Sequence, residues 1–335
     1  MINNKTILIT GGTGSFGQNF AQFLLKKFKL KKIIIYSRDE QKQFTMKNKL
    51  QKYGDRLRFF IGDVRDEDRL ELATKNVDYL VHAAAMKHVT IAEYNPFEAI
   101  KTNIMGAQNI INVSLKNNIK KVLALSTDKA SSPISIYGAS KLVSDKLFVA
   151  ANNYSGKNAC IFSVVRYGNV LGSKGSILPI FLNHQTQGHI PITDIKMTRF
   201  NITIDRSVKF VTNCIKKMLG GEIFVPKMQS FKVVDMAKAI SKNSKLKIIG
   251  IRPGEKLHEE LISSYESFNT IEFKDYFVIC SNSNIFKWNK KNYLNKKGGK
   301  SCPMNFNYNS LDNKDFLSID ELKKIISKEK RNIVL

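Results

Sequence analysis

The stretch Thr10-Gly-Gly-Thr-Gly-Ser-Phe-Gly17 decides how the rest of the chain is interpreted. It follows a short apolar run at residues 5–10, and at residues 16–28 the apolar residues recur with the spacing of a helix. In this setting the first glycine permits a tight turn, the second lets the backbone approach a pyrophosphate, and the third allows close helix packing. The stretch therefore predicts a dinucleotide-binding turn, with a purely structural glycine turn as the alternative.

Predicted strands and helices alternate along the first half of the chain. Strands are predicted at residues 5–10, 32–37, 59–63, 77–85, 122–127 and 160–167, with helices at 16–28, 96–117 and 137–152 among them. This alternation is typical of a doubly wound parallel sheet. The predicted fold class is therefore α/β, a Rossmann-like doubly wound parallel sheet with a smaller C-terminal substrate-binding domain.

The alternation weakens after residue 172, which sets the expected domain limits. Residues 204–219 and 233–241 are predicted helices and 222–225 a predicted strand, while the polar, Asn-rich C-terminal segment has no clear pattern. We expect residues 1–170 to form the dinucleotide-binding domain, with later returns to it near 204–241. Residues 171–335 are expected to supply mainly substrate-binding segments and a C-terminal tail.

The charge of the chain is strongly basic, with 54 Lys and Arg against 28 Asp and Glu. Most of the basic residues are lysines spread over the whole length, which indicates composition bias rather than a nucleic-acid-binding face, where arginines cluster. The densest basic stretch, residues 287–300, contains Trp288 and Tyr293 and could stack on RNA. We favour a solvated surface segment there and expect no nucleic-acid partner, although the positive field would draw in an anionic substrate.

Cysteines and hydropathy indicate the compartment. The four cysteines, at 160, 214, 280 and 302, are far apart and form no CxxC pair, so neither a disulfide framework nor a thiolate metal site is expected. No apolar stretch approaches the roughly 20 residues that cross a bilayer, and no leader segment precedes the first strand. We therefore expect a soluble cytoplasmic protein without a metal.

The end of the second predicted strand selects between dinucleotide cofactors. It reads Ser37-Arg-Asp39, and Ser37 and Arg38 are suited to a 2′-phosphate, which favours NADP. Asp39 leaves NAD open, because an acidic residue at this place holds the ribose hydroxyls, and Arg38 could simply pair with it. Asp63 and Val64, after the next strand, are expected near the adenine. The small residues of His82-Ala-Ala-Ala85 permit close passage of the backbone beside the cofactor.

A tyrosine and a lysine four residues apart on a predicted helix suggest redox chemistry. Tyr137 and Lys141 share one helix face, so that Lys141 can lower the pKa of Tyr137 and hold the nicotinamide ribose. Tyr137 can then take a hydroxyl proton while hydride leaves. The same spacing recurs at Tyr293 and Lys297 without supporting context. Tyr137 is favoured because it follows the strand that carries Ser126 and Thr127.

Asp128-Lys129 follows the predicted strand at 122–127, and six further motifs accompany it. They are Tyr36-Ser-Arg-Asp-Glu40, Ala85-Met-Lys-His-Val89, Arg166-Tyr-Gly-Asn-Val170, Pro191-Ile-Thr-Asp194, Met197-Thr-Arg-Phe200 and Gly254-Glu-Lys-Leu-His258. With this set the chain resembles the extended short-chain dehydrogenase/reductases that act on nucleotide sugars, and in particular the inverting UDP-N-acetylglucosamine 4,6-dehydratases of the pseudaminic acid pathway. Ordinary 4,6-dehydratases have an Asp-Glu pair in place of Asp128-Lys129, 4-epimerases have neither acid, and related capsule-forming dehydratases lack the tyrosine.

The resemblance implies a catalytic set and a cofactor set. Tyr137 and Lys141 would serve oxidation at sugar carbon 4, and Asp128 and Lys129 would be the acid and base of the elimination, in an order that stays open. Lys129 acts as a base only if its pKa is lowered, and a surface ion pair is the alternative for both residues. The expected cofactor contacts are Gly11, Thr13, Gly14, Ser15, Phe16, Gly17, Ser37, Arg38, Asp63, Val64, Ala83, Lys87, Ser126, Tyr137 and Lys141.

The resemblance also implies a substrate and its binding residues. UDP-N-acetylglucosamine would lose water with inversion at carbon 5, as the first step towards pseudaminic acid in flagellin or surface glycans, in a homo-oligomer that is a dimer or hexamer. Arginine forks suit its diphosphate, and Ser173 and Lys174 are expected to line the same cleft. The expected substrate contacts are Lys87, Asn169, Arg199, Arg252 and Glu255.

Two alternatives to this function stay open. One is another nucleotide-sugar enzyme, either a retaining 4,6-dehydratase or a 4-epimerase, and Lys129 in place of glutamate disfavours both. The other is a non-catalytic protein that binds NADP or RNA, which the complete set of Asp128, Lys129, Tyr137 and Lys141 disfavours.

Overall fold

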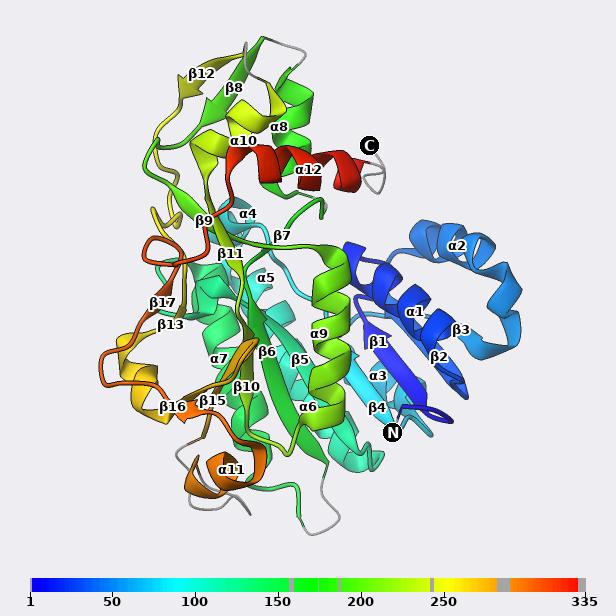
Figure 1. Ribbon diagram of the computed structural model, residues 1–335. Helices are drawn as coiled ribbons and strands as arrows, with labels where there is room; N and C mark the ends of the chain where they lie inside the picture. Colours follow the sequence, from blue (N-terminus) through cyan, green and yellow to red (C-terminus); the bar gives the residue numbers. More distant parts are fainter. Residues whose placement is uncertain are drawn as a thin grey trace.

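A ten-stranded sheet forms the centre of the molecule (Figure 1). The computed structural model describes residues 2–156, 160–173, 175–185, 188–241, 244–281 and 290–330. Seven neighbouring strands pair in parallel, and β15, β14 and β16 continue the sheet antiparallel. From one edge to the other the strands are β3 (Leu57–Ile61), β2 (Lys32–Ser37), β1 (Thr6–Thr10), β4 (Tyr79–His82), β5 (Lys121–Thr127), β6 (Ile161–Tyr167), β10 (Ile223–Pro226), β15 (Tyr276–Ile279), β14 (Thr270–Glu272) and β16 (Lys300–Ser301).

The strand order β3-β2-β1-β4-β5-β6 confirms the predicted doubly wound α/β fold. Strands buried on both faces read as continuous apolar runs, as in the three consecutive isoleucines of β2. Helices α1 (Ser15–Lys27) and α9 (Ile204–Lys217) pack side by side on one face. The other face is covered by α3 (Glu67–Thr74), α6 (Gly106–Lys116) and α7 (Ile136–Ala151) (Figure 1). Beyond these, α2 (Glu40–Lys49) and the 3-10 turn Gln51–Arg56 connect β2 to β3.

Strand β4 is shorter than the sequence predicts, and its early end shapes the cofactor region. The strand predicted at 77–85 extends only over Tyr79–His82. After it, the backbone N–H groups of Ala83 and Ala84 donate to the hydroxyl of Thr10, so the chain leaves the sheet beside the glycine turn. The carbonyl oxygen of Ala83 lies 2.8 Å from the place where a Cβ of Gly11 would be. A side chain at position 11 would therefore collide with this segment.

The helix predicted at 96–117 contains a π-helical turn. It is built from α5 (Pro96–Ile100), the π turn Lys101–Met105 and α6. Asn103 of this turn is buried, accepts the N–H of Met86 at 2.8 Å, and donates to the carbonyl of Met86 and the hydroxyl of Ser140. The wider turn thus ties the segment after β4 to α7. Helix α4 (Val89–Tyr94) leads into this region.

A second, smaller hydrophobic core lies beyond the ends of the parallel strands (Figure 1). Leu178, Ile190, Met236 and Leu322 are completely or almost completely buried in it. Within residues 204–241, β10 pairs in the large sheet and α9 packs on it, whereas α10 packs in this second core. The elements around it are α8 (Ile177–Gln185), α10 (Val233–Ile240), α12 (Ile319–Lys330), the pair β8 (His189–Ile192) and β12 (Lys245–Ile248), and the sheet of β7 (Asn169–Val170), β9 (Thr198–Ile202) and β11 (Gln229–Lys232).

The C-terminal segment without a sequence pattern also contributes to the large core. Besides β14, β15 and β16 it forms α11 (Lys290–Lys297), the 3-10 turn Ser264–Asn269, and the pair β13 (Glu260–Ile262) and β17 (Tyr308–Asn309). No helix in the described ranges is long and apolar enough to cross a membrane.

One buried arginine joins the C-terminal segment to the large sheet. Arg166 at the end of β6 is fully buried, 3.4 Å from Asp145 of α7 and 3.1 Å from Glu266 in the 3-10 turn after β13. It also donates to the carbonyl of Leu261 at 3.0 Å. Because a buried charge needs partners, these contacts fix α7, which carries Tyr137 and Lys141, against the C-terminal segment.

Replacing this arginine should destabilise the protein strongly. Arg166→Met leaves the buried carboxylate of Asp145 without its cation, and breaking a buried pair from one side costs about 3–5 kcal/mol. Urea denaturation should show this loss in the free energy of unfolding. Arg58→Met, at an exposed arginine of β3, is the matched control and should stay within about 0.5 kcal/mol of the wild type. Equal effects of both substitutions would contradict the structural role of Arg166.

Candidate active site

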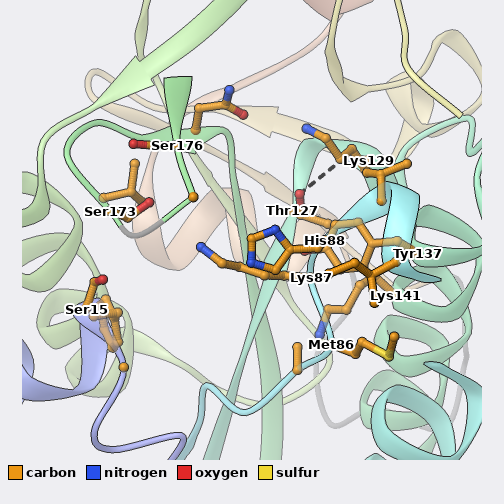
Figure 2. A pocket seen from close by; sticks show the side chains of 18 of the residues that line it. Ser15, Met86, Lys87, His88, Thr127, Lys129, Tyr137, Lys141, Ser173 and Ser176 are labelled. Carbon is orange, nitrogen blue, oxygen red and sulfur yellow. Dashed lines mark hydrogen bonds between the residues drawn. The ribbon is translucent and has the colours of Figure 1, made fainter. Parts of the chain in front are cut away.

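A cleft of about 1060 Å³ lies where the parallel strands end, between the large sheet and the second core. Figure 2 shows Lys129, Tyr137 and Lys141 on one side of it and Ser15 on the other, with Lys87 and His88 between them. Among the predicted site residues that the structure describes, Asp128 is the one that does not line the cleft, and it is fully buried. The lining includes Gly11, Thr13, Gly14, Ser15, Phe16, Gly17, Ser37, Arg38, Asp63, Val64, Ala83, Lys87, Ser126, Lys129, Tyr137, Lys141, Asn169, Arg199, Arg252 and Glu255.

The glycine turn has the geometry that a pyrophosphate needs. Gly11 has a positive φ of 62°, and a Cβ on Gly17 would lie 2.6 Å from the backbone of Gly12. Gly14 is the N-cap residue of α1 and has no side chain to bond the first backbone N–H groups of the helix. The positive end of the helix dipole therefore faces the cleft. Since each glycine meets a separate steric demand, this turn fits a dinucleotide phosphate.

The end of β2 places a basic side chain beside the cleft. Arg38 has a side chain 65% exposed and lies 3.5 Å from Asp63, which Arg65 also binds at 2.7 Å. Although burial opposes it, the hydrogen bonds and charge of Arg65 hold the pKa of Asp63 below its usual range. Asp39 instead caps α2 by accepting the N–H of Lys42 at 2.9 Å. Arg38 therefore pairs with Asp63 rather than with Asp39, the partner considered from the sequence.

Helix α7 holds Tyr137 and Lys141 one turn apart on its buried face. Ser135 caps the helix by accepting the N–H of Gly138 at 3.1 Å, which fixes where the helix begins. A Cβ on Gly138 would lie 2.2 Å from the carbonyl oxygen of Lys129, so the start of α7 packs directly against the Asp128–Ala130 turn. This contact places Tyr137 and Lys129 in one part of the cleft (Figure 2).

The protonation of Tyr137 depends on its surroundings. Burial outweighs the opposing charge of Lys129 and the hydrogen bond with Thr127, so the pKa of Tyr137 is raised to about 12. Lys129 is thus one cation that acts on this hydroxyl, and the lowering of its pKa by Lys141 stays a prediction from the sequence. Burial lowers the pKa of Lys141 itself, and Asp145 opposes that effect.

Lys129 lies between two buried carboxylates. Its Nζ is 3.0 Å from Asp128 Oδ1 and 2.9 Å from Glu259 Oε1, and both carboxylates are 1% exposed. Burial lowers the pKa of Lys129, but the charges of Asp128 and Glu259 outweigh it and raise that pKa above its usual value. Asp128 and Lys129 therefore do not form a surface ion pair, which was the alternative considered from the sequence. The lowered pKa that a base at Lys129 would require is also not found.

Glu259 is the residue that the sequence interpretation missed. It lines the cleft and follows directly on the motif that ends at His258. Its hydrogen bond with Lys129 joins residues 130 positions apart, so no local spacing indicated it. Burial raises the pKa of Glu259, yet the charges of Lys129 and Arg199 hold it below its usual value.

The predicted substrate residues form an ion-pair chain beside this cluster. Arg199 is almost completely buried, 3.6 Å from Glu259 and 3.4 Å from Glu255, and Glu255 in turn binds Arg252 at 3.0 Å. Burial lowers the pKa of Lys87. Asn169 and Ser173 also line the cleft, whereas Lys174 lies outside the described residues.

The second Tyr–Lys pair does not line the cleft, because Tyr293 lies in the hydrophobic core and Lys297 is exposed. Tyr293 of α11 is 2% exposed and packs edge-on against Phe273, away from the residues that line the cleft. Residues 282–289, including Trp288 of the basic stretch, lie outside the described part of the chain. Among the described residues no group of three or more His, Cys, Asp or Glu is arranged to hold a metal ion.

Comparisons with known proteins give the chain relatives along nearly its whole length. A family model described as polysaccharide biosynthesis protein matches residues 7–281. A Campylobacter jejuni protein named UDP-N-acetylglucosamine 4,6-dehydratase (inverting) is 51% identical over 331 residues, which are 98% of each chain. A Rickettsia canadensis protein named UDP-glucose 4-epimerase is 38% identical over 97% of this chain and 96% of that protein. The solved structure of Pen from Bacillus thuringiensis, 35% identical, superposes with a TM-score of 0.88 over 98% of this chain and 99% of that one.

Proposed function

We propose that this chain, which belongs to the polysaccharide biosynthesis protein family together with the inverting UDP-N-acetylglucosamine 4,6-dehydratases, catalyses that dehydration itself. The reaction makes it a hydro-lyase, with UDP-2-acetamido-2,6-dideoxy-β-L-arabino-hex-4-ulose as its product. The observation that carries the proposal is the shared cleft, in which the glycine turn, Tyr137 and the Lys129 ion cluster face one space. The 51% identical relative supports the same substrate.

The first step assigned to this site is oxidation at sugar carbon 4. A bound nicotinamide cofactor would accept hydride from carbon 4 and return it later to carbon 6. We assign removal of the carbon 4 hydroxyl proton to Tyr137; burial raises its pKa, and the charge of Lys129 and the hydrogen bond with Thr127 are the contacts that oppose this. Lys141, on the same face of α7, is assigned to hold the ribose of the cofactor beside it.

The second step is loss of water across carbons 5 and 6. The ketone formed at carbon 4 acidifies the proton on carbon 5, so an acid–base pair near the sugar is enough to remove water. We assign this step to Lys129 with Asp128, which lie 3.0 Å apart beside Tyr137. Arg199 and Arg252 are suited to the UDP diphosphate, with Lys87, Asn169 and Glu255 completing the substrate contacts.

NADP is the proposed cofactor, and the surroundings of Arg38 support it. Asp39 also lines the cleft, but its carboxylate caps α2 and pairs with Lys42, whereas the side chain of Arg38 stays 65% exposed beside Asp63. Ser37 adds a hydroxyl that bonds Thr13 at 2.7 Å. A bound 2′-phosphate would lie near the guanidinium of Arg38 and the hydroxyls of Ser37 and Thr13.

The cellular role follows from this product. We assign the chain to the first step of pseudaminic acid biosynthesis, for flagellin or surface glycans, in the cytoplasm, where four free cysteines would stay reduced. Exposed apolar side chains on α4 and α5, at Tyr94 and Phe97, support a homo-oligomer, because exposed apolar surface often marks an interface.

A 4-epimerase is the second candidate, since relatives at 38% identity carry that name. An epimerase returns hydride to carbon 4 and loses no water, so it has no use for an acid–base pair next to the tyrosine. The buried cluster of Asp128, Lys129 and Glu259 therefore favours the dehydratase. A product that keeps the mass of the substrate would favour the epimerase.

Tyr137→Phe should abolish most of the dehydration of UDP-N-acetylglucosamine. Mass spectrometry should show that the wild type with NADP forms a product lighter by one water. Loss of the hydroxyl should reduce this turnover by ~10²-fold or more, as for a lost general base. Tyr293→Phe, in the core, is the matched control and should leave turnover unchanged. The site assignment is wrong if Tyr293→Phe is the damaging substitution.

Arg38→Ala should weaken NADP binding far more than NAD binding. Only NADP carries the additional phosphate, and a hydrogen bond to a charged group contributes about 1.5–3 kcal/mol, which corresponds to roughly 10- to 100-fold in affinity. Titration calorimetry with both cofactors measures the difference, with Arg58→Ala as the control. An equal loss for NADP and NAD would mean that Arg38 is structural and would remove the argument for NADP.

Lys129→Met should separate oxidation from elimination. Methionine keeps the length and apolar stem of the side chain, and Tyr137 remains beside carbon 4 with Lys141 on the same helix face, although it loses the charge of Lys129 that lowers its pKa. On mixing with substrate, the variant should still reduce NADP⁺, visible as nicotinamide absorbance, but it should release no dehydrated product and incorporate little solvent deuterium at carbon 5. Normal dehydration by this variant would move the acid–base function to another residue.

A further inference from the structure

We propose that the end of the molecule opposite the cleft is an electrostatic docking surface for an anionic lipid bilayer. Docking there would be independent of the chemistry in the cleft. The surface, which we term the basic face, consists of seven exposed lysines near the amino ends of the parallel strands, namely Lys26, Lys27, Lys29, Lys31, Lys120, Lys216 and Lys217.

The doubly wound topology brings these lysines to one end of the molecule. Helices α1 and α9 both begin beside the cleft and pack together, and at their far ends the Nζ of Lys216 lies 5.0 Å from the centre of the Phe28 ring. The chain then passes the start of β1, where the N–H of Lys31 donates to the carbonyl of Lys5 at 3.1 Å. The basic face therefore surrounds the end that is marked N in Figure 1.

Few acidic groups neutralise this charge. In the part of the chain that the structure describes, the lysines of residues 26–31 take part in no ion pair. Asp78 is shared by two lysines, since it binds Lys5 at 3.0 Å and lies 3.9 Å from Lys120, whose side chain stays 66% exposed. Glu222, just before β10, is fully buried. The basic face therefore keeps an excess of positive charge towards solvent.

Helix dipoles explain only part of this charge. Cations are favourable in the last turn of a helix, because they face its negative end, and the lysines at 26–27 and 216–217 occupy such turns. Lys29, Lys31 and Lys120 instead lie in the connections that lead into β2 and β5. Since the dipole effect falls off within the last turn, these three lysines need another explanation.

The opposite end of the molecule also carries lysines but mixes them with acids. In α12, Lys323 pairs with Asp320 at 2.7 Å, and Glu321 lies in the same first turn. In α10, Asp235 precedes the exposed Lys238 by three residues. Composition bias alone would leave both ends equally mixed, so the basic face is distinguished by how few acids accompany its lysines.

The chemistry of the basic face suits lipid headgroups. All seven side chains are lysines, which act as point charges, whereas nucleic-acid sites favour arginine because its planar fork binds phosphate and stacks on aromatic rings. Clusters of about four to eight basic residues attract the anionic headgroups of a cytoplasmic leaflet. A protein held by this face would keep its cleft, at the other end of the strands, open to substrate and cofactor.

Co-sedimentation with vesicles tests this surface. The wild type should bind vesicles of equal parts phosphatidylglycerol and phosphatidylcholine but not pure phosphatidylcholine. Salt at about 1 M should release it, because the screening length then falls to about 3 Å. Lys27→Gln, Lys29→Gln and Lys31→Gln together should lower the partition coefficient roughly 100-fold, about fivefold for each lysine.

The matched control removes the same charge from the other end of the molecule. Lys238→Gln, Lys245→Gln and Lys324→Gln, at exposed positions of α10, β12 and α12, together leave the same net charge as the first triple variant. This control should keep the partition coefficient near the wild-type value. Equal losses in both triple variants would mean that net charge alone attracts the protein, and would overturn the proposal.

Labelling of the wild type shows directly which face meets the bilayer. Reductive methylation, followed by peptide mass spectrometry, compares the rate at each lysine with and without the anionic vesicles. Lys29 and Lys31 should be labelled several-fold more slowly on the vesicles, while Lys238 and Lys245 should keep their rates. Uniform protection, or protection of Lys238 and Lys245 instead, would contradict docking through the basic face.

Two further outcomes would also overturn the proposal. One is that the wild type fails to bind the anionic vesicles. The other is that a single-stranded RNA oligonucleotide binds in their place and loses affinity in the Lys27, Lys29 and Lys31 variant, which would make the basic face a nucleic-acid site.

Discussion

Burying an ammonium ion costs several kcal/mol unless carboxylates surround it, and Lys129 meets this requirement with Asp128 and Glu259. Asp128 follows β5 of the doubly wound sheet, while Glu259 comes from the segment just before β13. The cluster is complete only when these two distant parts of the chain meet. Lys129, Glu259 and Tyr137 all line the cleft, so this contact forms part of its wall. Folding of the C-terminal segment and assembly of the site thus both depend on the charges of Asp128, Lys129 and Glu259.

The rest of the site is arranged around this cluster by the parallel sheet. Strands β1, β2, β4 and β5 end at the same edge, as parallel strands with helical crossovers must, and each contributes the residues just beyond its end. The buried Arg166 repeats the principle further along the buried face of α7, where it ties Asp145 to Glu266. Two buried ion clusters thus hold one helix, and that helix carries the tyrosine.

Local signals in the sequence predicted much of this arrangement. The glycine turn and the alternating strands were predictable because each depends on neighbours within a few residues, and Tyr137 with Lys141 depends on one helical turn. The π turn at Lys101–Met105 was not predictable, because Asn103 holds it through hydrogen bonds with Met86 and Ser140, which belong to other parts of the chain. Glu259 was missed because its partner Lys129 is 130 residues away. The antiparallel strands β14 to β16 are short and lie among polar residues, so their pairing depends on the existing sheet edge rather than on a pattern of their own.

Stereochemistry at sugar carbon 5 distinguishes the proposed reaction from its alternatives, because proton removal and return must occur from opposite faces to invert that carbon. The most direct measurement is incubation of the wild-type enzyme and NADP with UDP-N-acetylglucosamine in heavy water, with NMR of the product. The dehydratase account predicts loss of one water, one deuterium at carbon 5 and inverted configuration there. A dehydrated product with unchanged configuration at carbon 5, or an epimer that has lost no water, would contradict it.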